Sequence, residues 1–199
     1  KKAGFIAFFI YIWFKEPIIH QMKKYTLLIL LFFALKSFSQ KEANIWYFGE
    51  NAGLDFNTNP PTALTNGMLD TFEGCSSFSD ADGNLLFYSD GITVYDKNHD
   101  LMKYTDGSLA DNLKGDPSST QSGMIIPKPG SSSIYYLFTV DDGPEYDRFG
   151  NKTEDGKGLN CYTIDMTLGG GIGQLIDENG DGVFYEDLSD GRFNNWEEK

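Results

Sequence analysis

Short apolar runs separated by polar turns dominate the chain after residue 40. The runs are four to seven residues long, rich in aromatic and β-branched side chains, and bounded by Gly, Asp, Asn or Ser, which is typical of β-strands. We expect strands at residues 45–48, 75–79, 84–89, 92–96, 121–127, 134–140 and 159–165. The only helix-like stretch in this region, residues 108–114, is too short to shape the fold. The predicted fold class is therefore all-β.

The turns predict how these strands pair. Asp82-Gly83 and Asp90-Gly91 separate three of the runs, and Asp-Gly pairs supply the positive φ angles that tight hairpins require. Residues 75–96 should therefore form a three-stranded antiparallel meander. The loop Lys128-Pro-Gly-Ser-Ser predicts a longer hairpin between the next two runs, with residues 159–165 as a third strand.

The beginning of the chain follows a different pattern. Met22-Lys-Lys is followed by an apolar core at residues 25–35 and by small residues at Ser37 and Ser39. These are the three parts of a secretory signal peptide, so we predict a signal-peptide helix at residues 22–39 and a mature N-terminus at Gln40. Residues 1–21 are a hydrophobic upstream extension. An alternative, a second helix forming a membrane hairpin, requires longer apolar runs, because a bilayer span needs about 20 residues.

Charge is distributed unequally along the chain. The net charge is −13, but residues 1–40 contain six Lys and one Glu, which leaves −18 for residues 41–199. Such a surface repels phosphate backbones and attracts divalent cations, so we expect no nucleic-acid partner. Only Cys75 and Cys161 are present. In an exported chain they either form one disulfide or remain two small buried side chains.

Bulky runs ending in a glycine turn recur, closing at Gly49, Gly91, Gly143 and Gly191. The separations of 42, 52 and 48 residues are typical of β-propeller blades, although aromatic strands and glycine turns also recur in other β-proteins. Residues 40–199 hold about three blades, fewer than the four that a closed ring needs. We therefore predict an incomplete β-propeller-like array of antiparallel meander sheets, and a chain that is a fragment of a longer protein.

Several motifs resemble a known family in the same order. They include Asn44-Ile-Trp-Tyr-Phe-Gly, Glu73-Gly-Cys-Ser-Ser-Phe-Ser-Asp, Gly83-Asn-Leu-Leu-Phe-Tyr-Ser-Asp-Gly, Ser119-Thr-Gln-Ser, Ile126-Pro-Lys-Pro-Gly and Tyr162-Thr-Ile-Asp-Met. Over residues 44–173 the chain is similar to the N-terminal part of gliding-motility-associated surface proteins, which leave gliding bacteria through type IX secretion by a type B sorting domain. That sorting domain is absent here, and the similarity weakens from about residue 175.

The resemblance implies a propeller-like region, export to the cell surface or medium, and a role in adhesion. It implies no catalytic residues. We therefore expect a binding protein without catalysis of its own, whose partners are an extracellular glycan or surface protein and, during export, the secretion machinery. The mature chain should contain no stable membrane span. The alternative is a carbohydrate-binding module, or the propeller part of a secreted polysaccharide hydrolase.

The best candidate for a metal site is an acidic loop at residues 177–188. A calcium loop places oxygen ligands at its first, third and fifth positions, glycine at the sixth and a carbonyl at the seventh. Asp177, Asn179, Asp181, Gly182 and Val183 match these positions. The twelfth position is Leu188, so Asp187 or Glu186 would have to supply the last carboxylate. The alternative is an acidic hairpin turn without a metal.

The remaining candidate groups have simpler interpretations. The acidic segment at residues 141–155 is a solvated insertion between strands, although Tyr146 and Phe149 in it offer rings for stacking on sugars. His99 is the only histidine of the exported region, and we expect it to be exposed in a turn. Residues 118–122 are rich in hydroxyls but have no base nearby, so they should shape the beginning of a strand.

Overall fold

The computed structural model describes residues 25–26, 41–141, 143, 145–146, 148–154, 156–178, 180 and 182–188. The chain divides into two compact units, residues 1–40 and 41–199, and all the described strands belong to the second. The predicted upstream extension and signal peptide lie outside the described residues, apart from Tyr25 and Thr26. Within the described ranges, no helix has the length and apolar character needed to cross a membrane.

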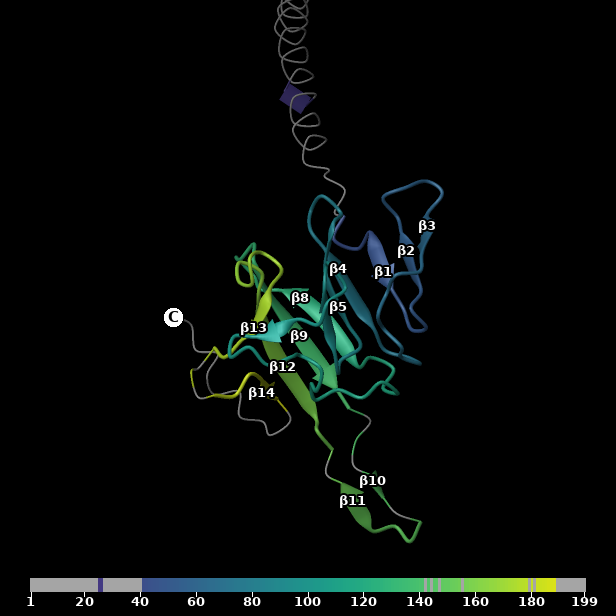
Figure 1. The fold of residues 1–199 in the computed structure, drawn as a ribbon, viewed down its shortest axis with the longest axis vertical. Coiled ribbons are helices and arrows are strands. Elements are labelled where there is room, and N and C mark those ends of the chain that lie inside the picture. Colours follow the sequence, from purple (N-terminus) through teal and green to yellow (C-terminus); the bar gives the residue numbers. More distant parts are fainter. Residues whose placement is uncertain are drawn as a thin grey trace, which may run out of the picture. The chain divides into compact units, whose positions relative to one another are not determined.

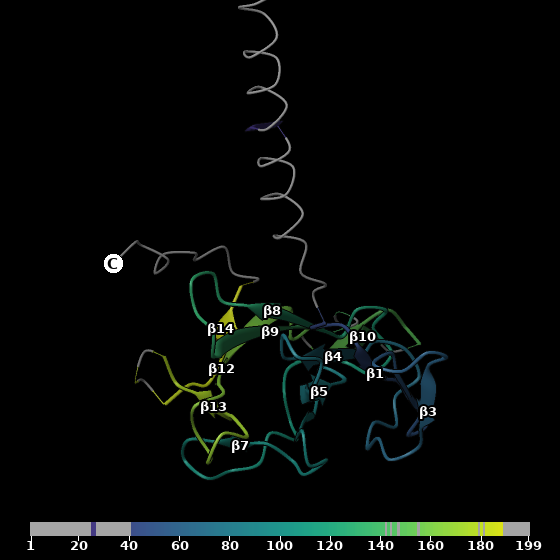
Figure 2. The same ribbon diagram turned by 90° about the horizontal axis from the view of Figure 1, so that it is seen from above.

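The described residues form fourteen strands in four sheets (Figures 1 and 2). The strands are β1 (Ile45–Tyr47), β2 (Gly53–Asp55), β3 (Thr62–Leu64), β4 (Ser76–Ser79), β5 (Leu85–Ser89), β6 (Val94–Asp96), β7 (Lys103–Tyr104), β8 (Gly123–Pro127), β9 (Ile134–Val140), β10 (Glu145–Tyr146), β11 (Lys152–Glu154), β12 (Leu159–Asp165), β13 (Gln174–Ile176) and β14 (Glu186–Asp187). The pairing is antiparallel except between β7 and β13. The all-β class is confirmed.

The first two sheets are three-stranded meanders, β1-β2-β3 and β4-β5-β6. The second is the meander predicted from the two Asp-Gly pairs, and Gly83 and Gly91 have φ angles of 91° and 87°. The third sheet has the order β7-β13-β12-β9-β8, with β14 also paired to β12. The predicted hairpin of β8 and β9 and the predicted strand β12 are confirmed there. The stretch at residues 108–114 is not helical; Leu109 forms a β-bridge with Lys103.

The second sheet buries side chains on both of its faces. Because side chains alternate along a strand, Phe87 and Tyr88 of β5 point to opposite sides. The Tyr88 ring stacks on Tyr47 of the first sheet, with centroids 4.6 Å apart, whereas the Phe87 ring meets Tyr135 of the third sheet at 5.6 Å. The three sheets are therefore layered face to face, in the order in which they occur along the chain.

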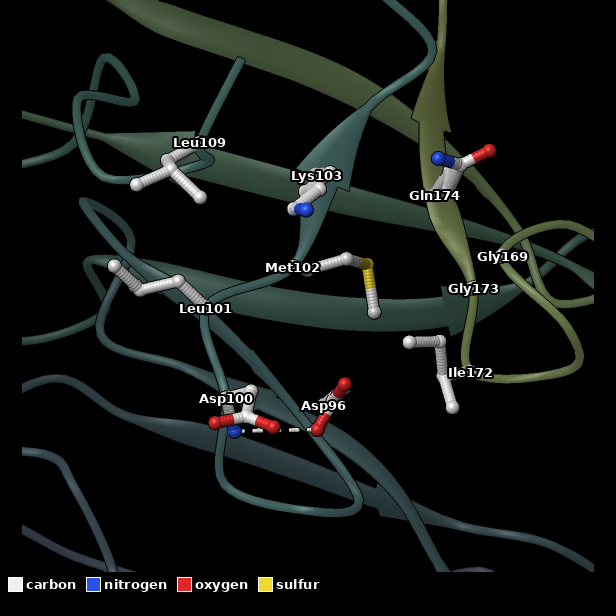
Figure 3. Close-up of a pocket in the computed structure, with 10 residues that line it drawn as sticks. All are labelled: Asp96, Asp100, Leu101, Met102, Lys103, Leu109, Gly169, Ile172, Gly173 and Gln174. Atoms are coloured by element: carbon white, nitrogen blue, oxygen red, sulfur yellow. Dashed lines mark hydrogen bonds between the residues drawn. The ribbon is translucent and has the colours of Figure 1, made fainter. Parts of the chain in front are cut away.

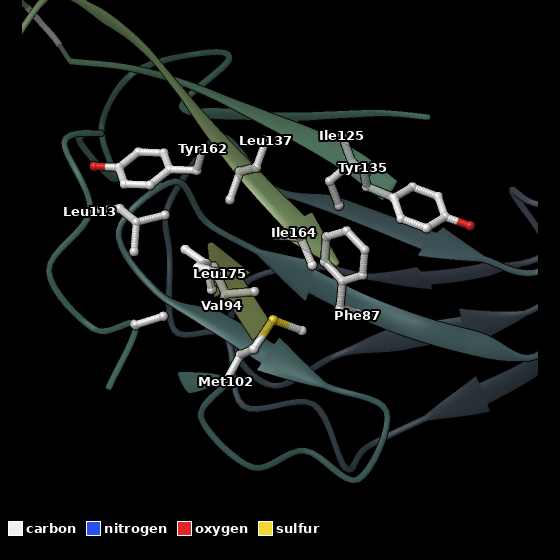
Figure 4. Close-up of a cluster of buried hydrophobic side chains, with 11 residues drawn as sticks. Phe87, Val94, Met102, Leu113, Ile125, Tyr135, Leu137, Tyr162, Ile164 and Leu175 are labelled. Carbon is white, nitrogen blue, oxygen red and sulfur yellow. The ribbon is translucent and has the colours of Figure 1, made fainter. Parts of the chain in front are cut away.

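The larger core lies between the second and third sheets (Figure 4). Its buried members are Phe87, Val94, Met102, Ala110, Leu113, Ile125, Tyr135, Leu137, Tyr162, Ile164 and Leu175. Met102, Ala110 and Leu113 come from the irregular segment after β6, which therefore covers the core between the sheets. The smaller core, between the first and second sheets, consists of Tyr47, Leu69 and Tyr88.

A close backbone junction joins β8 to the second sheet. The fully buried Ser122 hydroxyl is shared between the carbonyl oxygens of Gly74, at 2.9 Å, and Asp90. A Cβ atom on Gly74 or Gly91 would overlap the backbone of Ser122. Three of the motifs that carry the family resemblance meet at this junction, so their glycines and serine have a structural role here. The predicted role of residues 118–122 at the beginning of a strand is confirmed.

The glycine repeat does not mark equivalent positions in the structure. Gly49 follows β1, the first strand of the β1–β2 hairpin, whereas Gly91 and Gly143 follow β5 and β9, the second strands of the β4–β5 and β8–β9 hairpins. The predicted blade period is therefore wrong at Gly49, and Gly191 lies outside the described residues. The described residues form antiparallel meander sheets but no closed propeller.

The two cysteines are free thiols. Cys161 lies buried on β12, and Cys75 packs against the smaller core just before β4. Burial raises the pKa of the Cys161 thiol to about 12 and also raises that of Cys75. Because the thiolate is the reactive form, both behave as small core side chains, and the disulfide alternative is not realised.

Candidate functional site

An aromatic pocket of about 260 Å³ lies beside the loop that precedes β14. It is lined by Tyr104, Asn112, Lys114 and Tyr162 on one side and by Gly182, Val183, Phe184 and Tyr185 on the other. The first group comes from β7, the segment after it and β12, so the third sheet and its covering segment position the pocket. The second group belongs to the acidic loop singled out in the sequence.

The rings of this pocket pack in pairs. Tyr104 contacts Phe184 with centroids 4.6 Å apart, and Tyr162 contacts Tyr185 at 5.7 Å. The Lys114 ammonium lies 5.2 Å from the centre of the Tyr185 ring, and the Lys114 N–H donates to the Tyr162 hydroxyl at 2.9 Å. Flat aromatic faces beside an amide and an ammonium group can bind a ligand that has both apolar and hydroxyl-bearing surfaces.

Burial keeps the phenols of Tyr104 and Tyr162 neutral. It raises the pKa of Tyr104 to about 12, and it raises the pKa of Tyr162 despite the hydrogen bond from the Lys114 N–H, which acts in the opposite direction. Neutral phenols bind by hydrogen bonding and stacking, and they are poor bases near neutral pH. The sequence did not indicate Tyr104, Asn112 or Lys114, because residues 103–114 have no regular apolar period.

A second, larger cavity of about 530 Å³ lies between the turn after β6 and the glycine-rich turn before β13 (Figure 3). Asp96, Asp100, Leu101, Met102, Lys103, Leu109, Gly169, Ile172, Gly173 and Gln174 line it. The stretch from Leu168 to Gly173 connects β12 to β13, and Gly169, Gly170, Gly171 and Gly173 all have positive φ angles there. Nothing in the sequence indicated that this connection would face Asp96.

The predicted calcium loop is partly described. Asp177 accepts hydrogen bonds from the N–H groups of Gly180 and Gly182, both at 2.7 Å, and these bonds curl the loop around its carboxylate. Asn179, Asp181 and the side chain of Asp187 lie outside the described residues. In the part of the chain that is described, no three acidic, cysteine or histidine side chains converge to hold a metal ion. The calcium site therefore stays a prediction.

We expect calcium to stabilise the protein if this loop binds it. At 10 mM calcium and a dissociation constant of about 1 mM, binding to the native state contributes about 1.4 kcal/mol, or about 3 to 6 °C in Tm. Thermal unfolding with calcium and with a chelator measures the shift. Asp177→Asn should abolish the response, whereas Asp70→Asn, outside the loop, should retain it. Equal midpoints with and without the chelator would remove the metal hypothesis.

The second acidic segment holds the β10–β11 hairpin. The Asp141 carboxylate accepts hydrogen bonds from the N–H groups of Gly143 and Gly158, both at 3.2 Å, and from that of Lys157. Asp141 thus closes the base of the insertion. Phe149 is 74% exposed near its tip and contacts the Arg148 guanidinium. The side chain of Tyr146 lies outside the described residues.

His99 is not the exposed turn residue that the sequence predicts. It lies in a turn with a φ angle of 69°, but its ring is half-buried. Its Nδ1 lies 2.9 Å from the Tyr88 hydroxyl, and its Nε2 lies 2.7 Å from the Asn66 amide nitrogen. Both ring nitrogens therefore have structural partners. The sequence missed these contacts because they join segments 11 and 33 residues away.

Aspartates close many of the turns. Among the described residues, eight carboxylates accept a hydrogen bond from the N–H group two residues further along, as in an Asx-turn. They are Asp55, Asp80, Asp90, Asp96, Asp106, Asp116, Asp141 and Asp165. Part of the strong negative charge is thus explained by turn geometry.

We expect the free energy of unfolding to fall when the pH is lowered below about 4. Hydrogen bonds from the hydroxyl and N–H groups of Ser118 lower the pKa of Asp116, and Ser108 lowers that of Asp106 in the same way. The stabilisation is therefore complete above the ordinary carboxylate pKa and is lost as the pH falls through the lowered native value. Each contribution is small, because both carboxylates are exposed.

Urea unfolding at pH 7, 4 and 3 measures this dependence. Asp116→Asn should reduce the loss of stability between pH 7 and pH 3. Asp70→Asn is the matched control, since Asp70 makes no hydrogen bond through its side chain within the described ranges. An identical pH dependence in the two variants would contradict the assignment.

Comparison with known proteins identified no relative of this chain. No family model, curated protein or solved structure matches the chain. The resemblance to surface proteins of gliding bacteria therefore rests on the sequence motifs alone and stays a prediction.

Proposed function

We propose that this chain is part of an exported, cell-surface or secreted protein that acts by binding or adhesion and performs no catalysis of its own. The observation that carries the proposal is the aromatic pocket beside the loop at residues 182–185. The groups most capable of chemistry are used structurally: aspartates close turns, His99 links Tyr88 to Asn66, and Ser122 joins two sheets. The motifs shared with gliding-motility-associated proteins support export.

The arrangement of the layers supports a propeller-like continuation of the fold. Strands from the first three sheets contact one another in chain order: β1 of the first sheet contacts β4 of the second, and β4 contacts β8 of the third. Propeller blades pack their sheets face to face around an axis in this manner. In this proposal the loops at the ends of the strands, including residues 177–188, form the binding face.

The alternative, a carbohydrate-binding module, is favoured by the composition of the same pocket. Tyr185 and Phe184 present ring faces, and Asn112 and Lys114 add hydrogen-bond donors close to them. Sugars have one apolar face and a rim of hydroxyl groups, which such a lining complements. This alternative specifies the ligand class of the proposed binding function.

A panel of polysaccharides tests the ligand class. We expect the full chain to bind at least one, with the affinity lowered at least tenfold in Tyr185→Ala. Phe72→Ala is the control, because Phe72 is 93% exposed and lies outside the pocket. Equal binding by all three proteins would remove the pocket as the site, and no binding to any polysaccharide would reject the carbohydrate alternative.

Export is tested separately. We expect the full chain, expressed in a bacterium, to be recovered outside the cytoplasm with Gln40 as its first residue, as shown by N-terminal sequencing. Intact chain that retains residues 22–39 in the cytosol would overturn this part of the proposal.

A further inference from the structure

The larger cavity contains a buried carboxylate that faces open space. Asp96 is 1% exposed, and its Oδ1 accepts hydrogen bonds from the N–H groups of Asn98, at 2.7 Å, and Asp100, at 3.2 Å. Its other carboxylate oxygen has no hydrogen-bond partner among the described residues and points toward Met102 and Ile172 (Figure 3). Both turn N–H groups bind Oδ1, so the second oxygen keeps its accepting capacity and is available to a cationic ligand.

The rest of the cavity combines a second carboxylate with apolar walls. Asp100 lies beside Asp96, and Met102 lies between these acids and Lys103 (Figure 3). Leu101, Leu109 and Ile172 complete the apolar lining. At the rim, the Lys97 ammonium donates to the Gly171 carbonyl oxygen at 3.1 Å and links the two walls. The volume of about 530 Å³ is within the range of small-molecule sites.

We propose that this cavity binds a small aliphatic ammonium ion. The ammonium group is placed at the carboxylates of Asp96 and Asp100, and the alkyl chain lies along Met102 and Ile172. The long-range field of the acidic region, with a net charge of −18 over residues 41–199, attracts such a cation. Lys103, at the other end of the cavity, disfavours a second positive charge, so the site selects monoamines over diamines. This site is separate from the aromatic pocket and does not depend on the function proposed for it.

Pentylamine is the probe, and its binding to the full chain is measured by calorimetry or NMR titration near neutral pH. We expect it to bind at least tenfold more tightly than pentanol and pentanoate, which have a similar chain without the positive charge, and more tightly than 1,5-diaminopentane. Binding should weaken as the salt concentration rises. Equal binding of pentanol would overturn the role of the carboxylates.

Asp96→Asn keeps an oxygen that can accept the two turn N–H groups but removes the charge, and it should weaken pentylamine binding at least tenfold. Asp106→Asn is the matched control, because Asp106 has the same turn role outside the cavity. If Asp96→Asn does not fold, two other variants test the site. Asp100→Asn removes the charge of the second carboxylate, and Ile172→Trp fills the cavity from its half-buried apolar side; both should weaken pentylamine binding. Undiminished binding in the folded variants would overturn the proposal.

Discussion

Gly91→Ala is expected to lower the free energy of unfolding by about 2 to 5 kcal/mol. Gly91 has a φ angle of 87°, which costs an alanine about 1 to 2 kcal/mol. The added methyl group would also overlap the carbonyl of Ser122, whose carbonyl carbon would lie 2.6 Å from the new Cβ. Because the overlap is with backbone, relief requires moving β8 away from the second sheet. Urea unfolding monitored by fluorescence measures the change.

Gly130→Ala separates the backbone strain from the overlap. Gly130 has a comparable φ angle of 78°, but a Cβ there would meet no atom within 4 Å. We expect this variant to lose only the strain contribution of about 1 to 2 kcal/mol. If the two variants are equally destabilised, the close junction at Ser122 has no energetic importance.

Tyr88→Ala is expected to destabilise the protein by about 3 to 5 kcal/mol, the range for truncating a large buried aromatic side chain. Tyr88 is fully buried, and its ring stacks on both Tyr47 and Tyr95, with centroid distances of 4.6 and 5.4 Å. Removing the ring opens a cavity between the first and second sheets. Denaturant unfolding measures the loss, and a loss below about 1 kcal/mol would show that these sheets do not depend on this contact.

Tyr88→Phe keeps the ring and removes only the hydroxyl group. That hydroxyl accepts a hydrogen bond from the Met68 N–H at 3.2 Å and lies 2.9 Å from Nδ1 of His99. We expect a loss of about 1 to 3 kcal/mol, because polar partners are left unsatisfied. The NMR signals of the His99 ring should shift in this variant and remain unchanged in a distant control such as Phe149→Ala.

The local features of the fold were predictable from the sequence because they depend on neighbouring residues. Asp-Gly turns fixed the meander of β4, β5 and β6, and the strand predicted at residues 159–165 matches β12 to the residue. The short strands β2, β3 and β13 were missed, since three residues show no clear period. The parallel pairing of β7 with β13 joins segments about 70 residues apart, and no local pattern encodes it.

The candidate sites depended even more on long-range contacts. The acidic loop at residues 177–188 could be recognised in the sequence because a loop motif is local. Its neighbours in the pocket, Tyr104 and Lys114, could not be recognised, because they are distant in sequence. Asp96 showed only an ordinary turn pattern; its importance comes from Ile172, which the glycine-rich connection brings across the cavity. The glycine repeat was misleading because aromatic residues precede turns in both first and second strands.

Because Phe87 and Tyr88 point to opposite faces, the second sheet contributes side chains to both hydrophobic cores. Separating it from either neighbouring sheet would expose one of its apolar faces to water. The region should consequently melt as a single cooperative block, with tryptophan fluorescence from the first sheet and amide exchange in the third reporting the same midpoint.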